Sequence, residues 1–138
     1  MLVQPIASLK SQLDALIAED GHLDAATVHL FTNNIVPDVD TVVGDLTQAS
    51  FTGYAASSAI EWGAVYNVDG GKAVQGDRKQ FTASADVDPQ VAVYGYYLMS
   101  GDVTPVYLGA ERFDTPVYIR NSGDAVGVVP SFSVKNQS

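Results

Sequence analysis

The chain has 138 residues, of which 46% are hydrophobic and 17% are charged, and it contains no cysteine. This size and composition are typical of one globular domain, and they exclude a disordered chain, a disulfide framework and any site built on thiolates. The formal net charge of −9 argues against nucleic acid as a partner, because a protein that neutralises phosphates needs a basic face.

The first predicted element is an amphipathic helix over residues 5–19. Apolar side chains recur there at helical spacing and form one stripe: Ile6, Leu9, Leu13, Leu16 and Ile17. Pro5 is tolerated in a first turn, and Gly21 can end the helix in a left-handed conformation. We expect residues 1–21 to form a helical arm that packs either on its own domain or on a neighbouring subunit. The segment has no basic region and no long apolar run, so neither a secretory signal nor a membrane span is expected.

From residue 22 onward the pattern changes to short apolar, β-branched segments separated by turn residues. The predicted strands cover residues 26–31, 56–66, 72–74, 78–84, 91–99, 103–110, 117–121 and 127–134. Residues 32–50 are expected to form a long connection, since proline, glycine and aspartate interrupt the apolar pattern. A series of short strands without alternating helices predicts a mainly β fold. We expect an antiparallel β-sandwich or jelly roll over residues 22–138, preceded by the helical arm.

The predicted strand at residues 91–99 differs from the others because neither of its faces is polar. One face would carry Val, Val, Gly, Tyr and Met, and the other would carry Ala, Tyr, Tyr and Leu. A sandwich strand normally exposes one face to water, so we expect both faces of this strand to be covered. The cover is either the N-terminal helix or a second subunit, and tyrosine is favoured at subunit interfaces. Tyr94 and Tyr96 are therefore candidate interface residues.

Residue patterns that would indicate catalysis are missing from the sequence. His22 and His29 do not form a metal-binding pair on a helix, and no nucleophile elbow or phosphate-binding glycine loop occurs. His29 lies in the middle of a predicted strand, where we interpret it as a structural residue. We expect no catalytic residue, no cofactor and no metal, and hence no enzyme.

The acidic residues are concentrated in the first half of the chain. Residues 1–69 carry nine acidic side chains and one basic side chain, whereas residues 70–138 carry seven acidic and six basic ones. Asp38, Asp40 and Asp45 share one loop, but the glycine and the final glutamate of a calcium-binding EF-hand loop are missing. We interpret these acids as solvated side chains, which either attract a partner with a basic surface or keep the protein soluble.

Four segments resemble a pattern in a family of small virion proteins from tailed bacteriophages. They are Leu30–Pro37 (LFTNNIVP) and Asp45–Ala55 (DLTQASFTGYA), which precede the lone Trp62, and then Tyr94–Leu98 (YGYYL) and Gly109–Phe113 (GAERF). The resemblance covers residues 28–133 in order, and Gln48 stands where glutamate is common in the family.

The resemblance implies a capsid decoration (cement) protein that binds the outer face of a phage head and stabilises the shell. Its partners would be the major capsid protein and copies of itself in a trimer, and it would act in the virion after assembly in the host cytoplasm, without contact to a membrane. The expected contact residues are Leu9, Leu13, Leu16, Asp38 and Asp40, together with Tyr94 and Tyr96.

The alternative is a receptor- or carbohydrate-binding module of a phage tail or fibre. In that case Tyr54, Trp62 and Tyr66 would form an exposed aromatic platform for a sugar. The position of Trp62 distinguishes the two functions, because a platform loses its centre if this side chain lies in the interior.

Overall fold

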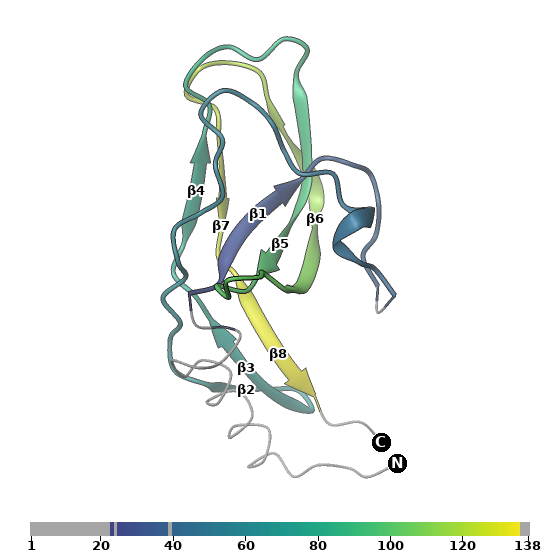
Figure 1. Cartoon of the computed structure of the whole chain (residues 1–138), viewed down its shortest axis with the longest axis vertical. Coiled ribbons are helices and arrows are strands. Elements are labelled where there is room, and N and C mark those ends of the chain that lie inside the picture. The colour runs from purple at the N-terminus through teal and green to yellow at the C-terminus, as the bar shows by residue number, and fades with distance from the viewer. Residues whose placement is uncertain (1–22, 24, 39, 136–138) are drawn as a thin grey trace.

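The computed structural model describes residues 23, 25–38 and 40–135, and this part of the chain is built almost wholly from antiparallel strands (Figure 1). The elements in chain order are β1 (Thr27–Phe31), the 3-10 helix η1 (Val43–Asp45), β2 (Tyr66–Val68), β3 (Gly71–Gln75), β4 (Lys79–Thr82), β5 (Val91–Met99), β6 (Tyr107–Ile119), β7 (Ala125–Val128) and β8 (Ser131–Lys135). Within the described residues they form three sheets, with the strand orders β1-β5-β6, β2-β3-β8 and β4-β7. The predicted mainly β, antiparallel class is confirmed.

Several predictions concern residues that the structure does not describe. The expected helical arm over residues 1–21 lies outside the described residues, and so do its contact residues Leu9, Leu13 and Leu16. In the part of the chain that is described, no helix is both long and apolar enough to cross a membrane.

β5 is the central strand of its sheet, and both of its faces are covered, as the sequence predicts. One face contributes to the main core through Val93, Tyr96 and Leu98. The opposite face contributes to a second cluster through Tyr94, Tyr97 and Met99. The core-facing positions change from odd to even numbers where the pairing register with β6 shifts, between Val93, which pairs with Val117, and Gly95, which pairs with Arg112.

The connection between β1 and β2 covers the second face of β5. Ile35 and Leu46 pack there against Tyr97, together with Phe31 from β1. The observed cover therefore comes from the long predicted loop.

The main core joins the β1-β5-β6 sheet to the β4-β7 sheet. It contains Val28 and Leu30 from β1, Phe81 from β4 and Val126 from β7, all almost fully buried. A smaller cluster around Leu23 and Val74 joins the β2-β3-β8 sheet to β6, with Trp62, Leu108 and Phe132 packed against it. Removal of these apolar side chains from water is the main stabilising contribution in such a fold.

The outer edge of β1 is covered by residues 47–60 of the same chain. The Val28 amide donates to Ser57 Oγ at 2.8 Å, and the Val28 carbonyl accepts from the Ser57 amide at 3.0 Å. The Leu30 amide donates to the Tyr54 hydroxyl at 3.2 Å, and its carbonyl accepts from the Ala49 amide at 2.9 Å. An edge strand whose backbone groups are paired in this way cannot add a further strand.

Three strand boundaries differ from the sequence prediction. The segment 56–66 forms a strand only from Tyr66, because its amides bond to two different strands: Ser57 N donates to Val28 O of β1, whereas Gly63 N donates to Gln75 O of β3. The predicted strands 103–110 and 117–121 merge into one long β6, which begins only at Tyr107 and ends at Ile119. The predicted strand 127–134 is divided at Pro130, which lies between β7 and β8. β7 pairs with β4, whereas β8 pairs with β3.

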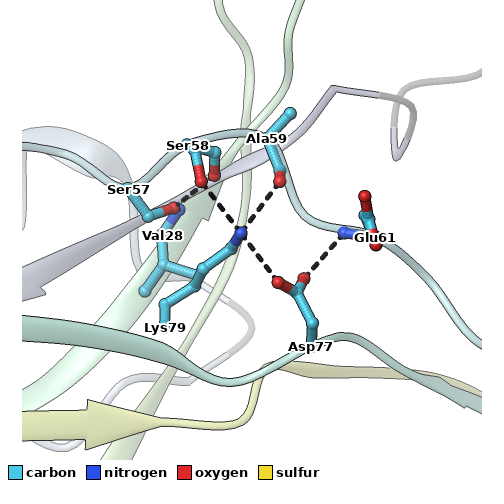
Figure 2. A network of polar contacts seen from close by, with 7 residues as sticks. All are labelled: Val28, Ser57, Ser58, Ala59, Glu61, Asp77 and Lys79. Atoms are coloured by element: carbon cyan, nitrogen blue, oxygen red, sulfur yellow. Dashed lines mark hydrogen bonds and ion pairs between the residues drawn. The ribbon is translucent and has the colours of Figure 1, made fainter.

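A buried lysine fixes the segment 57–61 to β4 (Figure 2). Lys79 is only 8% exposed. Its ammonium donates to Ser58 Oγ at 3.0 Å, to the Ala59 carbonyl at 2.9 Å and to Asp77 Oδ2 at 3.0 Å. The other carboxylate oxygen of Asp77 accepts from the Glu61 amide at 2.8 Å. All three donors of the buried ammonium are therefore satisfied.

Candidate functional site

The strongest candidate for a functional surface is a projecting loop that we call the acidic lobe, defined as residues 33–38 and 40–46. It contains η1 and extends away from the β1-β5-β6 sheet at the right of Figure 1. The predicted contact residues Asp38 and Asp40 lie exposed on it, and so does Asp45.

The acidic lobe is ordered by hydrogen bonds from its own polar side chains. Asn33, which the sequence marks as a turn residue, donates through Nδ2 to the Asp45 carbonyl and accepts through Oδ1 from the Thr47 amide, each at 2.8 Å. Asp38 Oδ1 accepts from the Asp40 amide at 2.9 Å, which closes an Asx turn. Asp45 Oδ2 accepts from the Val42 amide at 3.0 Å, at the start of η1. The backbone of the lobe is thus held in place by its own residues.

Arg112 of β6 anchors the base of the acidic lobe. Its Nη1 donates to the Ile35 carbonyl at 2.9 Å, and its guanidinium carbon lies 5.1 Å from the centre of the Tyr94 ring. The structure therefore brings the predicted interface residue Tyr94 to the base of the loop that carries Asp38. Arg112 belongs to a motif noted in the sequence, but its contact with a loop far away in the chain has no local signal.

Apolar side chains are exposed among the acids of the lobe. Val36 is 75% exposed and Val42 is 58% exposed, and Val43 is exposed beside them. Two shallow pockets flank Asp38: one of about 410 Å³ within the lobe, and one of about 370 Å³ between the lobe and β6. Exposed apolar residues rimmed by polar groups are typical of a protein–protein contact surface.

The acids of the lobe do not converge on one point. Among the residues that the structure describes, no group of three or more histidine, aspartate or glutamate side chains is placed to hold a metal ion. Asp38 and Asp45 instead use carboxylate oxygens to cap turns of the loop. The lobe therefore offers negative charge and apolar contact area.

Tyr96 lies on the opposite face of β5 from Tyr94 and is only 5% exposed. Its hydroxyl donates to Glu111 Oε2 at 3.1 Å and accepts from the Ser131 amide at 3.4 Å. Burial and the neighbouring Glu111 carboxylate raise the pKa of Tyr96. Of the two tyrosines predicted for an interface, Tyr94 thus lies next to the candidate surface, and Tyr96 connects β5, β6 and β8 from inside.

His29 is part of a polar network between β1 and the edge-covering segment. Its ring stacks on Tyr97 at 5.0 Å, and its Nε2 lies 2.9 Å from Thr27 Oγ1. Gln48 Nε2 donates to His29 Nδ1 at 3.1 Å and to the Tyr54 hydroxyl at 3.0 Å. Burial lowers the pKa of His29, and burial together with Tyr54 raises the pKa of Tyr97 to about 12. Both groups are therefore neutral near pH 7.

The three aromatic residues of the alternative function belong to different parts of the molecule. Trp62 is half-buried against both apolar clusters, and its Nε1 donates to the Leu23 carbonyl at 2.7 Å. Tyr54 stacks on Phe81 of the main core at 5.7 Å, and Tyr66 lies exposed on β2. The centre of the expected sugar platform is therefore engaged in packing.

No family model, curated protein sequence or solved structure matches this chain.

Proposed function

We propose that the chain is a structural protein of a phage virion, most directly a capsid decoration protein, and that the acidic lobe is its attachment surface. The observation that carries this proposal is the exposure of Val36 and Val42 on a loop whose backbone is already ordered. A partner that buries these valines gains apolar contact without the entropic cost of ordering the loop.

The carboxylates of the lobe define the chemistry of the partner. Asp38, Asp40 and Asp45 line one pocket together with Val36, so the complementary surface combines apolar side chains with lysine or arginine. The net charge of −9 also accelerates the approach to such a surface at low salt. In the proposed role this surface belongs to the major capsid protein, and the chain acts by binding, with no chemical step.

The same role motivates the finer structural expectations. We propose that the sheets close into a sandwich or jelly roll and that residues 1–21 form a helical arm. In a trimer the arm would clamp neighbouring subunits, because closed cyclic symmetry produces a finite cap on a capsid. The tail or fibre module is the less supported alternative, since the Trp62 indole is hydrogen-bonded to the backbone of residue 23.

The test uses undecorated heads assembled from the major capsid protein encoded in the same genome as this chain. The wild-type chain is expected to sediment with the heads, and a double variant with Val36→Ser and Val42→Ser is expected to stay in the supernatant. The matched control is Val103→Ser, which changes a fully exposed valine on the β5–β6 connection outside the lobe.

Three results would contradict the proposal. A wild-type chain that does not bind the heads refutes the decoration role, and so does a genome without a capsid gene. Equal binding by the lobe variant and the control refutes the lobe as the attachment surface. Light scattering coupled to size exclusion tests the trimer separately, because a monomer at all concentrations contradicts it.

A further inference from the structure

The outer edge of β6, which faces away from β5, is a second candidate binding surface. β6 is the outer strand of the β1-β5-β6 sheet. The opposite outer strand, β1, is covered by residues 47–60, as described above. Within the described residues, no strand pairs with the outer side of β6.

The direction of the β6 backbone groups follows from the bonds of β1. Val28 and Leu30 direct their amides and carbonyls away from β5, so His29 between them directs its own groups toward its partner Tyr97. Tyr97 therefore directs its backbone amide and carbonyl toward β1. The neighbouring Tyr96 must direct its own amide and carbonyl toward β6, where its partner is Glu111.

The same alternation continues into β6. Since Glu111 bonds toward β5, the adjacent Ala110 and Arg112 direct their amides and carbonyls outward. No hydrogen bond from another described residue reaches the Ala110 amide. Among the described residues, the amides and carbonyls that Ala110 and Arg112 direct to the outer edge of β6 thus have no backbone partner.

A pocket lies on each face of the sheet beside this edge, and both pockets share Leu108, Gly109 and Ala110. The first has a volume of about 220 Å³, and it is lined on the main-core face by Tyr96, Glu111 and Phe132, among others. The second is the pocket of about 370 Å³ under the acidic lobe, which is lined by Asp38 and Tyr107 on the opposite face. The side chains of an added strand point alternately to the two faces, so two consecutive residues of such a strand would reach one pocket each.

We propose that the outer edge of β6 binds an extended basic segment of a partner protein as an added β-strand. Main-chain hydrogen bonds to Ala110 and Arg112 supply the alignment, and the two pockets supply the selectivity. Each pocket contains one carboxylate, Glu111 in the first and Asp38 in the second. Neither is paired with a lysine or arginine among the described residues. The apolar walls suit the methylene groups of lysine, whose ammonium would reach the carboxylate.

This inference rests on the proposed attachment function only for the source of the segment, which would be an extended arm of the capsid protein. It adds to that function a second contact with a defined chemistry. The lobe would contribute apolar contact, and the adjacent edge would contribute strand pairing, with Asp38 shared by both.

The probe is a synthetic peptide, TVTKKVT, with blocked ends, and the readout is amide hydrogen exchange of the whole chain followed by NMR. In the free protein the outward amides of Ala110 and Arg112 are expected to exchange rapidly, whereas the inward amides of Gly109 and Glu111 are protected. Saturating peptide is expected to slow exchange at Ala110 and Arg112 and to leave the inward amides unchanged. The control peptides are TVTEEVT, which reverses the charges, and TVTKPVT, which cannot continue a ladder; neither should protect these amides.

Variants of the chain separate the backbone contribution from the charge contribution. Ala110→Pro removes an outward amide that bonds to no described residue, and it is expected to abolish peptide binding. Glu111→Gln and Asp38→Asn keep a hydrogen-bond acceptor at each position and should each weaken binding by about two- to fivefold, the size of an exposed ion pair. Asp69→Asn and Glu61→Gln remove the same charges elsewhere and should leave binding unchanged. If Ala110→Pro does not fold, the exchange pattern of the wild type and the charge variants still test the proposal.

Several outcomes would overturn the inference. Peptide binding without protection of Ala110 and Arg112, or equal protection by the acidic peptide, contradicts it. If higher protein concentration without peptide slows exchange at the same amides, the edge binds a second copy of this chain, and the proposed partner segment is wrong. If the chain binds heads while the amides of Ala110 and Arg112 still exchange rapidly, the strand-addition inference fails and the attachment function stands. If the peptide protects these amides but the chain does not bind heads, the attachment function fails and strand addition stands.

Discussion

Replacement of Lys79 by methionine tests whether the buried ion pair holds the segment 57–61 in place. Methionine keeps an unbranched apolar stem of similar length and removes the ammonium. The substitution deletes the three hydrogen bonds to Ser58, Ala59 and Asp77, whose lengths are 2.9–3.0 Å.

The size of the effect follows from the exposure of the groups left behind. Ala59 itself is exposed, so the loss at its carbonyl is that of a hydrogen bond to a charged donor, about 1.5–3 kcal/mol. The Asp77 side chain is 41% exposed, so water replaces much of its lost partner and the full cost of breaking a buried pair does not apply. We expect Lys79→Met to lower the free energy of unfolding by about 2–4 kcal/mol, or Tm by roughly 6–12 °C for a domain of this size.

Chemical denaturation in urea, with circular dichroism as the probe, measures this difference. Lys72→Met is the matched control because it removes a lysine from β3 that is not buried, and it should cost less than about 1 kcal/mol. A Lys79 variant as stable as this control would show that the ion pair contributes no net stability and that the apolar contacts alone hold the segment.

The acid dependence of Asp77 provides a second readout of the same network. The Glu61 amide and Lys79 hold the pKa of Asp77 below its ordinary value of 3.8. A carboxyl with a lowered folded pKa stabilises the fold above its unfolded pKa, and this contribution disappears as the pH falls through the folded value. The stability difference between the wild type and Asp77→Asn should therefore be constant at neutral pH and decline below about pH 4. A difference that does not change with pH would contradict the role of the charge.

Three further substitutions test the β1-β5-β6 sheet. Gly95→Ala would place a Cβ atom against the Glu111 carbonyl and 2.6 Å from the Phe31 ring, so urea unfolding should show a loss of about 2–4 kcal/mol. Unchanged stability would mean that the β6 backbone and Phe31 shift to make room for the methyl group. His29 has a lowered folded pKa, so the unfolded chain binds more protons and stability should fall as the pH drops below 6.5. His29→Gln should reduce this dependence of stability on pH. An NMR titration that gives the His29 imidazole an unshifted pKa would refute the explanation. Tyr54→Phe removes the acceptor of the Leu30 amide and should cost about 1–3 kcal/mol in thermal unfolding, whereas an unchanged Tm would show that water replaces the hydroxyl.

The elements that sequence reasoning predicted well are those with strong local patterns. The bounds of β5 were predicted as observed, because eight apolar or aromatic residues and Gly95 lie between turn residues. The loop over residues 32–50 was also predicted from its proline, glycine and aspartate residues. Exposure of Asp38 and Asp40 follows from the same composition.

The features that were missed depend on contacts between distant parts of the chain. The segment 56–66 has the composition of a strand, but its amides bond to β1 and β3 in turn, and no local pattern encodes that division. The role of Arg112 depends on a carbonyl of the lobe, and the burial of Lys79 depends on the segment 57–61. A charged residue read alone is assigned to the surface, so the sequence could not identify either anchor.

The position of β5 between β1 and β6 also determines the order in which the sheet can form. β5 and β6 are joined by a short connection, whereas β1 and β5 are separated by residues 32–90. Closure of the shorter loop loses less chain entropy, so the β5–β6 hairpin should form before β1 adds to it. On the ribosome β1 leaves the exit tunnel early, yet its pairing partner is synthesised only much later. The backbone groups of β1 that face β5 therefore remain hydrated until residues 91–99 have emerged, and we expect β1 to add to an already formed β5–β6 hairpin.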